Sequence, residues 1–267
     1  MKVFSCRGGV LILLKQNLIK AFLYLTTKLA GAGFLYLVMS GYLLISTGFD
    51  LYEFVEEISH GFLWFVVYVY GILCSIIIDL LTYKISKKHF SVKILLYVVA
   101  GYAFFIVREI NVIMLIAGTV GALCSIIFYV GAYNSFRFQS FKYAVIIAPL
   151  FVTMLMNFDF TEKEQWVEVR SDHTYIATFE YFNGKHEIPF HVKEGQAITV
   201  FHDFKNTNGG GHGFHFLSGK NNVIGMTEVS EKKVKLEVQD SGVYSMVVTG
   251  DDVKGSFLVT WEIDEDG

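Results

Sequence analysis

Long apolar runs fill the first 159 residues, whereas the remaining residues alternate between apolar and polar positions. The hydrocarbon core of a bilayer requires about 20 mostly apolar residues for each spanning helix. Five stretches meet or approach this length, and we predict a transmembrane helix for each: 29–48, 61–82, 92–107, 111–133 and 143–159. The sequence therefore predicts a multi-pass α-helical membrane domain over residues 29–159.

The segment that precedes these runs is less apolar. Lys15, Gln16, Asn17 and Lys20 interrupt the apolar residues of 8–27 at nearly helical spacing. We predict that residues 1–28 form a cytoplasmic N-terminus whose amphipathic helix lies on the membrane surface. A sixth span at this place is the alternative, and it would invert the orientation of the chain.

Positive charge alternates between the predicted loops. The N-terminus carries five lysine or arginine residues, loop 49–60 carries none, and loop 83–91 carries three lysines. The turn at 108–110 is neutral, and loop 134–142 carries one arginine and one lysine. Because cytoplasmic loops are enriched in lysine and arginine, the N-terminus is predicted to lie inside. An odd number of spans then places residues 160–267 outside the cell membrane.

Residues 160–267 have the pattern of an all-β domain. The run from Val234 to Val238 alternates apolar and charged residues, as does a strand with one buried face. Turn signals at Asn183–Gly184 and Lys254–Gly255 divide the region further. We predict eight or nine short strands, arranged as an antiparallel sandwich or jelly-roll.

The last part of this domain resembles a known class of domains. The residues that carry the resemblance are Gly242-Val-Tyr244, Gly250, Lys254-Gly255-Ser256-Phe257 and Trp261. They are similar to the closing hairpin of small extracytoplasmic β-sandwich domains of Gram-positive lipoproteins and surface proteins. The resemblance implies a sandwich placed outside the membrane, and it implies no single activity. The helical half shows no such resemblance.

Charge and cysteine content restrict the partners and the chemistry. Residues 1–159 carry twelve basic and seven acidic residues, whereas 160–267 carry ten basic and eighteen acidic ones. The β domain thus has a net charge of −8, which argues against nucleic acid as a partner. Its cysteine content is zero, because the chain has only Cys6, Cys74 and Cys124. The core of the domain must therefore hold it together without a disulfide.

Two helical segments share a short motif. The sequence Gly71-Ile-Leu-Cys74-Ser75 returns fifty residues later as Gly121-Ala-Leu-Cys124-Ser125. One hypothesis is a parallel repeat of a helical hairpin, as in some transporters. The other is that small residues such as Gly121, Ala122 and Ser125 allow close helix packing, within the chain or in a homo-oligomer.

Asp79 is the only acidic residue in the interior of a predicted span, since Asp159 is the last residue of the fifth one. Charged residues within a bilayer often mark a transport path. Asp79 also lies near the cytoplasmic end of its span, about one turn from Lys84. It is therefore either a carboxylate that reaches the membrane surface or part of a proton or cation path.

Histidines form the one concentration of reactive groups in the β domain. His202, His212 and His215 surround a glycine-rich stretch, with His191 and Asp203 nearby. We consider His202, His212 and His215 as candidate ligand-binding residues, and as weak candidate metal ligands. His212 and His215 are three residues apart, so a strand directs them to opposite faces. Zinc usually takes three or four ligands, and blue copper is excluded because it needs a cysteine, so the metal stays unknown and we expect no cofactor.

The sequence contains no recognisable catalytic motif: the glycine run lacks the residues of a phosphate loop, and no nucleophile elbow is present. We therefore expect a binding, sensing or accessory protein rather than an enzyme. Its expected partners are the lipid bilayer and a cell-envelope ligand or partner protein. A channel or transporter subunit is the first alternative, and a membrane effector with a cytosolic ligand-binding β domain is the second.

Overall fold

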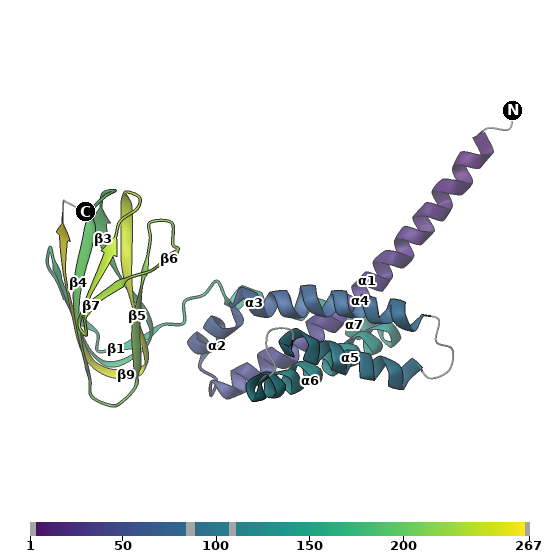
Figure 1. The fold of residues 1–267 in the computed structure, drawn as a ribbon, viewed down its shortest axis with the longest axis horizontal. Helices are drawn as coiled ribbons and strands as arrows, with labels where there is room; N and C mark the ends of the chain where they lie inside the picture. The colour runs from purple at the N-terminus through teal and green to yellow at the C-terminus, as the bar shows by residue number, and fades with distance from the viewer. Residues whose placement is uncertain (1–3, 84–88, 107–110, 265–267) are drawn as a thin grey trace. The chain divides into compact units, whose positions relative to one another are not determined.

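The computed structural model describes residues 4–83, 89–106 and 111–264. The chain divides into two compact units, a helical unit over Met1–Phe158 and a β unit over Asp159–Gly267 (Figure 1). Each unit has its own cluster of buried apolar side chains. A helical first half followed by an antiparallel β domain confirms the predicted fold class at this level.

A single helix, α1 (Phe4–Ser46), opens the helical unit. It continues without a break past residue 28, so no helix end separates the stretch 8–27 from the first predicted span. The placement of 8–27 on the membrane surface stays a prediction. This stretch contains no proline, and nothing else in it interrupts helical hydrogen bonding. Apolar side chains such as Leu18 and Phe22 are 69% and 66% exposed, which leaves them available to lipid.

The remaining helices are mostly apolar. They are α2 (Leu51–Ile58), α3 (Gly61–Trp64), the π-helical η1 (Phe65–Tyr70), α4 (Gly71–Thr82), α5 (His89–Ile106), α6 (Val112–Arg137) and α7 (Gln139–Leu155). In the described part of the chain, three helical stretches are long and apolar enough to cross a membrane: Gln16–Ser46, Gly61–Thr82 and Val112–Arg137. The apolar helices α5 and α7 are shorter, so the five predicted crossings stay a prediction.

Two of the predicted loops are largely helical. Helix α6 ends at Arg137 and α7 begins at Gln139, which leaves only Phe138 of the predicted loop 134–142 between them. Predicted loop 49–60 contains α2, whose first turn is capped by Asp50: its side chain accepts a hydrogen bond from the Glu53 N–H at 3.0 Å. The turn predicted at 108–110 lies outside the described residues.

Glycines bring the helices of this unit into close contact. A Cβ atom on Gly101 of α5 would lie 2.4 Å from the Gly121 carbonyl oxygen of α6. A Cβ atom on Gly33 of α1 would lie 2.1 Å from the Val145 carbonyl oxygen of α7. No side chain fits at such distances. The close packing predicted at Gly121 is therefore confirmed, and it occurs within the chain.

The β unit is one sheet of nine antiparallel strands. The strands are β1 (Glu162–Glu164), β2 (Val167–Arg170), β3 (Thr174–Val192), β4 (Ala197–Asn206), β5 (Gly211–Leu217), β6 (Val223–Ile224), β7 (Thr227–Ser230), β8 (Lys233–Glu237) and β9 (Gly242–Asp264). Their order is β1-β3-β9-β4-β8-β7, with β2 beside β3 and β5 between β9 and β6. Hydrogen bonds connect all the described strands, so the two separate sheets of the predicted sandwich are not confirmed.

Two predicted turns are wrong for one shared reason. Asn183–Gly184 lies inside β3 and Lys254–Gly255 lies inside β9, and these two long strands pair along most of their length. The register of β3 shifts between Phe179 and Phe182 and again between Phe182 and Gly184. Both glycines have positive φ, 130° for Gly184 and 150° for Gly255. The glycines therefore mark a bend shared by two paired strands, where local sequence predicts two hairpins. The closing hairpin implied by the resemblance is likewise a single bent strand.

This bend lets the sheet close over one core. Phe190 pairs with Tyr244 at one end of the β3–β9 ribbon, and Trp261 pairs with Val200 on β4 at the other end. The rings of Phe190 and Trp261 nevertheless lie 5.0 Å apart. Both halves of the ribbon thus contribute to the same apolar cluster, and each large buried side chain adds about 1.5–3 kcal/mol to stability.

Candidate functional site

Three helices of the helical unit meet at the carboxylate of Asp79. Lys28 of α1 lies 2.5 Å from Asp79 Oδ2, and Lys93 of α5 lies 2.8 Å from Oδ1. The Tyr24 hydroxyl donates a further hydrogen bond to Oδ2 at 2.9 Å. The side chain of Lys28 is only 7% exposed, so its charge depends on this carboxylate. The network ties α1, α4 and α5 together.

The sequence singles out Asp79 but not its partners. The predicted neighbour Lys84 lies outside the described residues. Lys28 stands at the edge of a predicted span and Lys93 inside one, and sequence spacing alone does not show that both face α4. The sequence feature that points to these partners is the rarity of charge in the apolar segments. A charged residue within an apolar helix needs a partner of the opposite sign nearby.

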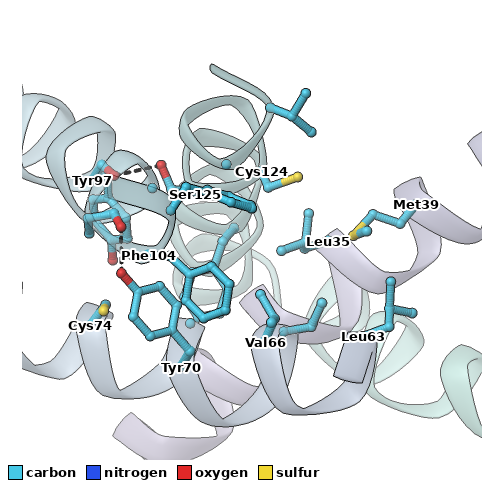
Figure 2. Close-up of a pocket in the computed structure, with 18 of the residues that line it drawn as sticks. Leu35, Met39, Leu63, Val66, Tyr70, Cys74, Tyr97, Phe104, Cys124 and Ser125 are labelled. Carbon is cyan, nitrogen blue, oxygen red and sulfur yellow. Dashed lines mark hydrogen bonds between the residues drawn. The ribbon is translucent and has the colours of Figure 1, made fainter. Parts of the chain in front are cut away.

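An apolar cavity of about 200 Å³ lies elsewhere in the same unit. Figure 2 shows Leu35 and Met39 on one side of this space, with Tyr70 and Phe104 nearby. Its polar groups are already used: the Tyr70 hydroxyl donates to the Ala100 carbonyl at 2.5 Å. A cavity of this kind favours apolar contents over water.

Both copies of the repeated motif belong to this region. Cys74 and Cys124 line the cavity from α4 and α6 (Figure 2). Ser75 shares a hydrogen bond of 2.5 Å with the Tyr97 hydroxyl, and Ser125 donates to the Tyr97 carbonyl at 2.7 Å. The two motifs thus hold one tyrosine of α5 from two helices, which gives the repeat a packing role.

The structure brings two of the three predicted histidines together. The rings of His202 on β4 and Phe214 on β5 lie 4.3 Å apart, and those of His212 on β5 and Phe204 on β4 lie 4.8 Å apart. Strands β4 and β5 both pair with β9 but not with each other, so these four rings connect two strands that share no hydrogen-bond ladder. We call His202, Phe204, His212 and Phe214 the aromatic rim. Burial lowers the pKa of the half-buried His202, whereas His212 is exposed.

His215 does not join this group. Strand β5 pairs with β9 in unbroken register from Gly211 to Leu217, so the chain does not bend between His212 and His215. The two side chains therefore lie on opposite faces of β5. Among the described residues, no three histidine, cysteine or acidic side chains lie close enough together to hold a metal ion.

Asparagine side chains fix the glycine-rich loop that joins β4 to β5. Asn206 Oδ1 accepts hydrogen bonds from the backbone N–H groups of Asn208 and Gly209, at 3.1 and 2.8 Å. Asn208 Nδ2 donates to the Asp252 carbonyl at 2.7 Å, and Asn208 Oδ1 accepts from the Lys254 N–H at 3.0 Å. The loop is thus held against the bend in β9, and it fixes one end of the aromatic rim.

A second polar network, which the sequence analysis missed, surrounds His186 of β3. Its Nδ1 atom lies 2.9 Å from Lys163 Nζ, and its ring lies 5.0 Å from the Trp166 ring. Glu168 accepts hydrogen bonds from Trp166 at 2.8 Å and from the Tyr175 hydroxyl. Burial, followed by the neighbouring charge of Lys163, lowers the pKa of His186 to about 4. They come from the two short strands β1 and β2, from the link between these two, and from the long strand β3, so no sequence motif marks them.

Comparisons with known proteins add little to this geometry. No protein-family model matches the chain, and no curated protein matches it. One similar solved structure is PliG of Aeromonas hydrophila, a periplasmic lysozyme inhibitor of g-type lysozyme. The similarity has 17% sequence identity and a TM-score of 0.26, and it covers 35% of this chain and 93% of that chain. A TM-score of this size supports no argument about function.

We predict that Asp79→Asn destabilises the helical unit. The substitution leaves the buried Lys28 ammonium without its carboxylate, which typically costs about 3 kcal/mol or more. Chemical denaturation of the full chain in detergent measures the loss. Glu57→Gln, which removes an exposed carboxylate of α2, is the matched control. Equal stability of the two variants would contradict a structural role for the network.

We also predict that the β unit loses stability as the pH falls from about 6.5 to about 4. The folded-state pKa of His186 lies below its ordinary value of 6.5, so the unfolded chain binds more protons in this window. Protonation therefore favours unfolding. Denaturation of residues 159–267 at several pH values measures the slope, which should be smaller in His186→Gln than in the exposed-histidine control His191→Gln. Identical slopes would show that His186 is not the responsible group.

Proposed function

We propose that the chain is a membrane-anchored binding protein. The helical unit anchors it, and the β unit presents a ligand-binding or partner-binding surface on the outer side of the membrane. The observation that carries this proposal is the aromatic rim, because partly exposed aromatic groups on a rigid support are typical of binding surfaces. A catalytic role is not part of the proposal.

Charge supports the outer placement of the β unit. The basic residues of the N-terminus and of the loops follow the rule for cytoplasmic segments. The three long apolar helices alone, or these together with α5 and α7, give an odd number of crossings. Either number places the two ends of the chain on opposite sides of a bilayer.

The rim has the properties of a preformed site. Two half-buried phenylalanines, Phe204 and Phe214, supply apolar area whose rings lie nearly parallel, at 13°. His202 and His212 add ring nitrogens that donate and accept hydrogen bonds. Since the loop beside them is held by Asn206 and Asn208, little ordering cost remains when a ligand binds.

The alternatives have less support from the geometry. A channel or transporter subunit draws on the repeated motif and on Asp79, but two lysines already engage this carboxylate. A membrane effector requires the β unit to lie in the cytosol, which the distribution of basic residues argues against. The net negative charge of that unit also disfavours nucleotides as its ligand.

We predict that a photo-crosslinking amino acid at His212 gives covalent adducts in intact cells. His212 is exposed at the rim, so a bound ligand or partner lies within reach. The control position is Glu194, exposed in the turn at the opposite end of β4. Adducts at position 212 that disappear with Phe214→Ala support the rim as the binding surface. No adduct at 212, or the same adducts at 194, would refute it.

A further inference from the structure

A pocket of about 580 Å³ lies beside Asp79, between α1, α4, α5, α6 and α7. Its charged lining residues are Lys20, Lys28, Asp79, Lys93 and Lys142. Polar uncharged side chains, among them those of Tyr129, Tyr133 and Gln139, complete the wall.

The charges of this pocket do not balance. Four lysines and one aspartate give its lining a formal net charge of +3. Asp79 is already engaged by Lys28 and Lys93, at 2.5 and 2.8 Å. In the part of the chain that the structure describes, neither Lys20 nor Lys142 forms an ion pair with this carboxylate. Positive charge of this density in a largely apolar unit attracts an anion.

Lys142 shows the imbalance most directly. The residue is 7% exposed, although it lies in the first turn of α7. Its ammonium lies 5.4 Å from the centre of the Tyr143 ring. Within the described residues, no carboxylate and no hydrogen-bond acceptor pairs with it. The lysine side chain is largely buried and lines the pocket without a partner among the described residues, so an anion in the pocket can serve as its counter-charge.

We propose that this pocket binds a phosphate-bearing anion. A phosphate group carries up to two negative charges and several strong acceptor oxygens, which suit a set of lysines with tyrosine and glutamine donors. The pocket lies where α4 ends and where α5 and α7 begin, at the predicted cytoplasmic ends of these helices. Basic pockets between helices at this level bind the headgroups of anionic lipids. The phosphate comes either from such a headgroup or from a soluble compound.

The test uses the full chain in nanodiscs of neutral phosphatidylcholine. Phosphatidylglycerol is added to the bilayer in one arm, and inorganic phosphate to the buffer in the other, while thermal unfolding is recorded. We expect an upward shift of the unfolding temperature in at least one arm. In Lys142→Gln the apparent affinity should fall by about tenfold, the usual effect of losing one charge-assisted contact. Lys142→Arg should keep the response, and Lys193→Gln, an exposed lysine of the β unit, serves as the control.

The outcomes separate the sources and decide the proposal. A shift with phosphatidylglycerol alone assigns a lipid headgroup, whereas a shift with inorganic phosphate assigns a soluble compound. A folded Lys142→Gln variant with an unchanged response overturns the proposal. So does the absence of a shift in both arms.

Discussion

A buried lysine needs a counter-charge, and the arrangement of the helical unit depends on this requirement. Lys28 is nearly inaccessible, and its partner Asp79 lies 2.5 Å away on another helix. Lys93 and Tyr24 complete the shell of the same carboxylate, so three helices are positioned by one side chain. Small residues then let the helices approach closely, as at Gly101 and Gly121. Electrostatics selects the register, and close packing makes that register stable.

The β unit depends on a different constraint, a bend shared by two paired strands. Glycines at 184 and 255 adopt positive φ values that other residues rarely take. The bend turns the β3–β9 ribbon back over its own core and brings β4 near β5 without pairing them. The rings of the aromatic rim connect these two strands. The proposed binding surface is therefore a consequence of how the sheet closes.

Local pattern was enough to predict the fold class but not the connections. Apolar length predicted the helical half, and alternation such as that at 234–238 predicted strands. Turn chemistry is local, so it predicts a turn at Asn183–Gly184, whereas the register shift there depends on pairing with β9, about seventy residues later in the chain. Spacing correctly separated His212 from His215, yet the approach of His202 to Phe214 depends on sheet closure. Partners such as Lys28 and Asp79 are 51 residues apart, which no periodicity reveals.

The central claim is that the helical unit spans the membrane and holds the β unit outside. A reporter fused after Gly267 tests this most directly, with one fusion active only outside the cytoplasm and a second active only inside it. The account predicts that the outside reporter is active and the inside reporter silent. The reverse result would contradict it, because an even number of crossings would then leave the β unit in the cytosol.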